Sequence, residues 1–139
     1  MKPFYRTIEH TADIGIEVLA PTCSDIFVRS ALALFDMMLG VDSIGGGLEK
    51  PFRVEGDSLE ELLVAWLNDL LYIYAVEGIV FSGFADVRLE DGSFSATGLG
   101  EAFRPEKHTV ASEIKAATYH GIFIAPEGAG WKARVIFDV

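Results

Sequence analysis

The sequence predicts an α+β domain in which two helices pack on one face of a mainly antiparallel β-sheet. Two segments of the first half have apolar residues at helical spacing, and the second half alternates apolar and polar residues between turn signals. The length of 139 residues, half of them apolar, suits one buried core and is short for two ordinary domains. We therefore expect residues 1–139 to form a single domain.

A strand and a helix are predicted first. Residues 13–19 alternate apolar with polar or small residues, the period of a half-buried strand, and Pro21 then interrupts the pattern. Residues 24–39 carry a helical apolar stripe that stops at Gly40, a residue typical of helix C-termini. The apolar positions of the strand are Ile14, Ile16 and Val18.

The second helix is predicted over residues 58–76, after a glycine-rich loop at 44–47 and a short strand at 51–55. Ser58 and Glu61 have the spacing of a capping box, which marks a helix N-terminus. The helix is apolar on most sides, so we expect it to be central in the domain.

The remaining sequence is typical of strands joined in hairpins. An Asp-Gly pair at 91–92 and a glycine-containing turn at 128–130 favour antiparallel pairing. The predicted strands cover residues 79–89, 93–103, 110–125 and 131–139.

Composition and charge exclude several classes of protein. A formal charge of −10 disfavours binding of a phosphate backbone as the main activity, so any connection with RNA is expected to be indirect. The acidity fits simple solubility, a basic partner or the gathering of cations. One cysteine, Cys23, and three histidines are too few for a disulfide framework or a Cys-rich zinc cluster, which favours a reducing, cytoplasmic setting. No signal peptide or membrane-spanning run is seen, so no membrane partner is expected.

Strand parity places three chemically useful side chains on polar faces. Counting along 110–125 puts Lys115 outside the core, and the same counting puts Asp13 and Asp138 opposite the apolar positions of their strands. The core-facing set of 110–125 is Ile114, Ala116, Ile122 and Ile124, and the other set is Glu113, Lys115, Tyr119 and Phe123.

The last residues suggest a cation site. The α-carboxylate of Val139 is expected beside Asp138, and two adjacent anions repel unless cations, N–H groups or water absorb the charge. A third carboxylate such as Asp13 would complete a site for a hard divalent ion, with calcium, magnesium or manganese favoured over zinc or copper. From spacing alone, Asp138 is more often a solvated residue at a strand end than a metal ligand.

Other reactive residues have ordinary structural explanations. His10 and Thr11 could stabilise a turn ahead of the strand at 13–19. His108 and His120 could act as acid–base groups or simply form local hydrogen bonds. Cys23 could have a lowered pKa near a helix start or be buried and inert. No dinucleotide-binding, P-loop or zinc-protease motif occurs.

Three segments together resemble the archease family. They are Glu9-His10-Thr11-Ala12-Asp13-Ile14-Gly15, Lys115-Ala116-Ala117-Thr118-Tyr119-His120-Gly121 and the terminal Phe137-Asp138-Val139. The two predicted helices also stand where this family has its helices. The resemblance spans the whole chain and implies an archease-like fold.

The resemblance implies a protein cofactor rather than an enzyme. An archease activates an RtcB-type tRNA-splicing RNA ligase by promoting its guanylylation and multiple turnover. By the same resemblance Asp13, Asp138 and Val139 match the metal-binding positions, with calcium the expected cation, and Lys115 matches a lysine needed for activation. Two alternatives remain at this point, a metal-dependent hydrolase and a general protein-interaction or chaperone-like module.

Overall fold

A computed structural model describes residues 5–9 and 13–139 of the chain. Every strand pair in these residues is antiparallel. In chain order the elements are β1 (Tyr5–Glu9), β2 (Asp13–Ala20), α1 (Cys23–Leu39), the 3-10 turn η1 (Val41–Ser43), β3 (Leu48–Glu55), α2 (Leu59–Glu77), β4 (Ile79–Glu90), β5 (Ser93–Ala102), β6 (Ala116–Glu127) and β7 (Gly130–Asp138).

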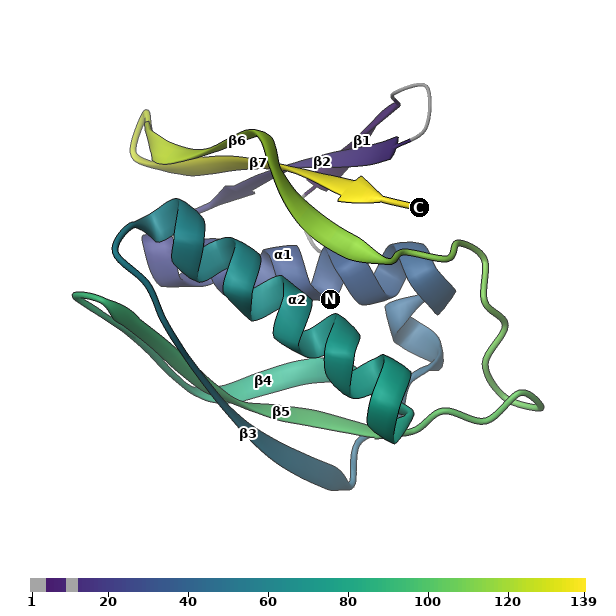
Figure 1. Cartoon of the computed structure of the whole chain (residues 1–139). Coiled ribbons are helices and arrows are strands. Elements are labelled where there is room, and N and C mark those ends of the chain that lie inside the picture. The colour runs from purple at the N-terminus through teal and green to yellow at the C-terminus, as the bar shows by residue number, and fades with distance from the viewer. Residues whose placement is uncertain (1–4, 10–12) are drawn as a thin grey trace.

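The strands form two sheets, and the helices lie between them (Figure 1). The four-stranded sheet has the order β1-β2-β7-β6, and the three-stranded sheet has the order β3-β5-β4. The α+β class with two helices and antiparallel strands is thus confirmed, but the prediction of one sheet covered on one face is wrong. Residues 30–35 of α1 are all buried, which a helix covered on only one side would not show.

Both helices begin and end at the residues that their sequences favour. The side chain of Thr22 caps α1, and Gly40 follows it with a φ of 77°. At the start of α2, the Ser58 hydroxyl accepts the N–H of Glu61 at 3.1 Å, and the Glu61 carboxylate accepts the N–H of Asp57 at 3.2 Å. Ser58 therefore caps the helix as predicted, whereas Glu61 bonds the N–H of the residue before the cap and not that of Ser58 itself.

An aromatic cluster fills the space between α2 and the three-stranded sheet. Trp66 is fully buried, and its indole N–H donates to the carbonyl of Phe27 at 2.9 Å. Its rings lie within 5.3 Å, centroid to centroid, of Phe52, Phe84 and Phe94. The prediction that α2 is central is correct, because this helix contacts both sheets.

Two strands differ from the sequence prediction. β1 was not predicted; it pairs with β2 at the edge of the four-stranded sheet. The strand expected over 110–125 begins only at Ala116, and its register against β7 shifts between Thr118 and Phe123. The shift breaks the alternation of faces, so Ala117, not Ala116, is the buried residue that lies opposite a core position of β7.

No helix within the described residues is long and apolar enough to cross a membrane.

Candidate functional site

Three neighbouring strands bring the predicted site residues to one end of the four-stranded sheet (Figure 1). Asp13 of β2 lies directly opposite Asp138 of β7, and Ala116 of β6 lies opposite Asp138 on the other side. The backbone N–H of Lys115 donates to the carbonyl of Asp138 at 2.9 Å. Residues from both ends of the sequence and from its 115–121 segment therefore meet here.

The two aspartates lie on the face of the sheet that points away from the helices. Phe137 next to Asp138 is buried in the core, and successive side chains of a strand alternate between faces. Residues directly opposite each other have Cβ atoms about 4.5–5.5 Å apart, so the carboxyl groups are neighbours. Lys115 and Asp138 are exposed, Asp13 is half-buried and Val139 is 43% exposed. We call Asp13, Lys115, Asp138 and Val139 the tip.

The tip offers oxygen donors to a cation. Carboxylate oxygens suit calcium, magnesium or manganese and give no preference to zinc or copper. Within residues 5–9 and 13–139, no group of three or more His, Cys, Asp or Glu side chains has the arrangement of a metal site. The predicted turn residues His10, Thr11 and Ala12 lie outside the described residues.

Asn68 fixes the start of β6, and the sequence analysis missed this residue. Its side-chain amide donates to the carbonyl of Ala117 at 3.1 Å, and its side-chain oxygen accepts the N–H of Ala117 at 2.7 Å. These bonds replace a neighbouring strand at the open edge of the sheet, two residues from Lys115. A lone amide inside the apolar helix α2 is the sequence signal that could have pointed to it.

A bulge follows in the 115–121 segment. Thr118 pairs with Ile136 and Phe123 pairs with Arg134, so β6 advances by five residues while β7 advances by only two. The Thr118 hydroxyl donates to the carbonyl of Ile136 at 2.9 Å and also accepts the N–H of His120 at 3.3 Å. Tyr119 is 59% exposed and His120 is also exposed, so the bulge turns both rings to solvent.

Glu17 is the centre of an ion cluster on the outer face of the same sheet. The Arg6 guanidinium contacts its carboxylate at 2.7 Å, that of Arg134 at 3.0 Å, and the Lys132 ammonium lies 3.9 Å away. The hydrogen bond from Arg6, ahead of that from Arg134, lowers the pKa of Glu17 against an opposing effect of burial. Strand alternation places Glu17 on the same face of β2 as Asp13, but nothing in the sequence pattern indicates these partners.

Glu101 holds the segment between β5 and β6 against the loop after η1. Its carboxylate accepts the N–H of Gly45 at 2.8 Å and contacts Lys107 at 2.7 Å and the buried ring of His108 at 2.8 Å. The hydrogen bond from Gly45, followed by that from Lys107, lowers the pKa of Glu101 to about 2. Because Nδ1 of His108 accepts the N–H of Arg104 at 2.9 Å, Nε2 carries the proton that faces Glu101. Of the two explanations for His108, the structural one therefore fits.

Cys23 is the first residue of α1 and is half-buried. Burial, with a smaller contribution from Glu60, raises the pKa of its thiol. A raised pKa keeps the thiol protonated at neutral pH, so the inert reading of this cysteine fits the structure.

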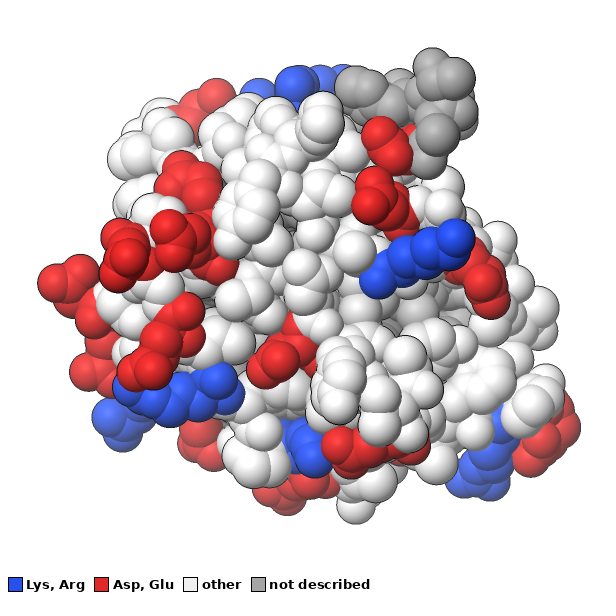
Figure 2. Space-filling view, in the orientation of Figure 1, with Lys and Arg blue, Asp and Glu red and all other residues white. Residues whose placement is uncertain are grey.

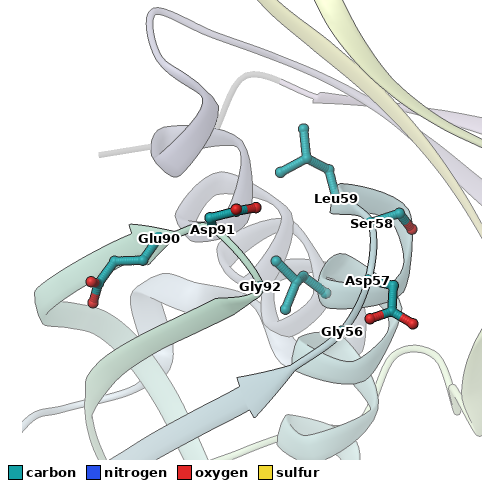
Figure 3. A pocket seen from close by; sticks show the side chains of 8 residues that line it. Gly56, Asp57, Ser58, Leu59, Glu90, Asp91 and Gly92 are labelled. Atoms are coloured by element: carbon teal, nitrogen blue, oxygen red, sulfur yellow. The ribbon is translucent and has the colours of Figure 1, made fainter.

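A pocket of about 420 Å³ lies away from the tip residues, at the N-terminus of α2 (Figure 3). Asp57 and Ser58 line it from the α2 side, and Glu90, Asp91 and Gly92 line it from the β4–β5 turn. None of the predicted site residues lines it.

Comparison with known proteins identifies the family. The model of the Archease protein family matches residues 5–139. A protein archease from Pyrococcus furiosus is 42% identical over 136 residues, covering 94% of this chain and 95% of that protein. One from Methanosarcina mazei is 37% identical over 139 residues, covering 97% and 95%. The chain therefore belongs to the archease family.

Solved structures agree with this assignment. Protein 1598 of Methanobacterium thermoautotrophicum, solved in solution, is 32% identical with a TM-score of 0.85, and the match covers both chains completely. A crystal structure from Thermotoga maritima, described as an archease and possible chaperone, has a TM-score of 0.62 over 96% of each chain. At 23% identity it supports the fold alone.

Proposed function

We propose that this protein activates an RtcB-type RNA ligase by promoting its guanylylation, which permits multiple turnover in tRNA splicing and RNA repair. The proposal places the protein in the cytoplasm and gives it no catalytic centre of its own. The observation that supports it best is the tip. Asp13 of β2, Asp138 of β7 and Lys115, the residue before β6, are the positions that the family resemblance marks, and they meet at one exposed end of a sheet.

The tip is exposed and can therefore contact a partner protein. Lys115 is exposed, and its backbone is anchored to Asp138, so the ammonium projects from a fixed base. An activator accelerates a reaction only by stabilising one state of the ligase, or its transition state, more than the others. Insertion of a fixed charged tip near the nucleotide pocket of the ligase would supply such a difference.

A divalent cation, with calcium our expectation, would be held by Asp13, Asp138 and the terminal carboxylate of Val139. Calcium takes six to eight oxygens, so backbone and water oxygens would complete the shell. Bound there, it would neutralise the neighbouring carboxylates and present positive charge. Calorimetric titration of Ca²⁺ tests this proposal: an extra residue after Val139 and Asp138→Ala should each weaken binding, whereas Asp42→Ala, an exposed control, should not.

The deciding experiment compares ligase guanylylation and multiple-turnover RNA joining with wild type, Lys115→Ala, Asp13→Ala and Asp138→Ala. Each variant should lose most activation while its circular dichroism and thermal melting remain those of wild type. Lys50→Ala is the matched control. Lys50 is a part-exposed lysine of β3 in the three-stranded sheet, and its ammonium pairs with the carboxylate of Glu77 at the end of α2. Full activation by a folded Lys115→Ala protein would remove this residue from the mechanism, and no activation by wild type with its cognate ligase would overturn the proposal.

The same preparations separate the alternatives. The Thermotoga maritima protein is described as a possible chaperone, and a chaperone-like protein would bind many unfolded clients regardless of Asp13. A metal-dependent hydrolase would show phosphatase or nuclease activity alone. We expect neither behaviour.

A further inference from the structure

Helix α2 has an exposed apolar stripe that the described part of the chain, residues 5–9 and 13–139, does not cover. A helix that is apolar all round is normally buried all round. Yet Tyr72 and Val76, one turn apart, are 61% and 62% exposed. Ala65 and Asp69 continue the same row at helical spacing and are half-buried. We call Ala65, Asp69, Tyr72 and Val76 the α2 stripe.

The α2 stripe continues towards the tip. Asn68, next to Asp69 and one turn before Tyr72, is bound to Ala117 of β6 through both polar atoms of its side chain. Ala117 is two residues from Lys115 on one side and two from the exposed Tyr119 on the other. A single partner surface could therefore touch the stripe and receive Lys115.

Charge indicates what kind of surface would cover the stripe. α2 contains no Lys or Arg, and its charged residues are Glu60, Glu61, Asp69 and Glu77. In the face shown in Figure 2, uncharged side chains form a broad band with acidic groups on both of its sides and a basic side chain on its right. Burial already raises the pKa of Asp69, and deeper burial on docking would be costly unless a cation were supplied opposite it. A nucleic acid, being anionic, does not fit this face.

We propose that the α2 stripe is the docking surface for the RNA ligase, and that the ligase meets it with an apolar patch flanked by Arg or Lys side chains opposite Asp69. This inference rests on the proposed function and adds to it that binding and activation depend on two different surfaces. The stripe supplies affinity, because exposed aromatic and aliphatic side chains gain most from burial at an interface. The tip supplies activation once the complex has formed.

The experiment measures ligase binding and guanylylation as functions of the concentration of this protein. Tyr72→Arg and Val76→Arg put positive charge against the proposed basic flank, and Leu19→Arg is the control, since Leu19 is 51% exposed at the far end of β2 from Asp13. Each stripe variant should raise the Kd for the ligase roughly 10- to 100-fold and still reach wild-type activation at saturation. Lys115→Ala should bind normally and fail at saturation.

Each outcome has a defined meaning. If Tyr72→Ser and both arginine variants, all folded by circular dichroism, bind the ligase as tightly as wild type, the stripe is not the docking surface. If wild type neither binds nor activates the ligase, the proposed function itself is wrong, and the docking surface is wrong with it. If sedimentation shows a wild-type dimer that Tyr72→Arg dissociates, the stripe covers a second copy of this chain and the inference is wrong.

Discussion

The three-stranded sheet packs aromatic rings against the helices, whereas the four-stranded sheet covers them mainly with aliphatic side chains and carries the candidate site at one end, with Asp13 and Asp138 on its outer face. Phe52, Phe81 and Phe94 of the first sheet are buried around Trp66. On the four-stranded sheet, the described residues of all three segments that resemble the archease family lie on or directly beside β2, β6 and β7.

This difference separates the region that stabilises the domain from the region that acts on a partner. Changes around Trp66 should alter the free energy of unfolding first, and changes at the tip should alter activity with little effect on folding. The predictions below test that separation, beginning with the largest effect on stability.

Trp66→Ala should lower the free energy of unfolding by about 3–5 kcal/mol. The substitution removes a fully buried indole, its ring contacts and its hydrogen bond to Phe27. Urea denaturation monitored by circular dichroism measures the change. Tyr72→Ala is the matched control, an exposed aromatic residue on the same helix, and should change stability by no more than about 0.5 kcal/mol. Similar values for both would mean that the aromatic cluster is not the main source of stability.

Glycine-to-alanine changes should also distinguish the two sheets. A Cβ on Gly100 of β5 would collide with the backbone carbonyl of Val80 and lie 2.9 Å from Cα of Phe81, and backbone atoms cannot easily move away. A Cβ on Gly15 of β2 would meet Cδ1 of Ile136 at 2.7 Å, the end of a side chain that can rotate. Gly100→Ala should therefore cost about 1–3 kcal/mol and Gly15→Ala less than about 1 kcal/mol in the same urea assay. The reverse order would contradict the role in stability that we assign to the three-stranded sheet.

Local sequence predicted the elements well but not how they associate. Both helices were placed to within one residue at each end, because the caps at Ser58, Gly40 and Gly78 act within a few residues. The division into two sheets was not predicted, since a period of two tells which face of a strand is apolar and not which strand is its neighbour. The edge strand β1 was missed altogether.

The site shows the same limit. Lys115 was expected to be exposed from strand parity, yet it precedes β6, and the bulge after Thr118 breaks the parity that the prediction used. Asn68 bonds a residue 49 positions away and Glu101 one 56 positions away, so neither contact leaves a local pattern. We expected Asp13 to lie near Asp138 from the family resemblance and because a cation would relieve the repulsion between neighbouring carboxylates. The strand register places the two residues directly opposite each other.

The smallest predicted effects concern one carboxylate on each sheet. Both Glu17 and Glu101 have lowered pKa values, so each contributes stability that is present above the ordinary glutamate value of 4.5 and is lost as the pH falls through the pKa of the folded state. For Glu101 this window runs from 4.5 down to about 2. Glu101→Gln should flatten the loss of stability across that window, as measured by urea denaturation at a series of pH values.

Salt should separate the two carboxylates. The largest contribution to the lowered pKa of Glu17 comes from Arg6, whose side chain is 72% exposed, whereas that of Glu101 comes from the uncharged N–H of Gly45. At 1 M salt the screening length is only about 3 Å, so exposed charges interact weakly, while a hydrogen bond from the backbone persists. Carboxyl-carbon NMR titration in low salt and in 1 M salt should therefore move the pKa of Glu17 towards its ordinary value more than that of Glu101. Equal shifts would show that Lys107, and not Gly45, dominates at Glu101, and that the carboxylates of the two sheets are held in the same way.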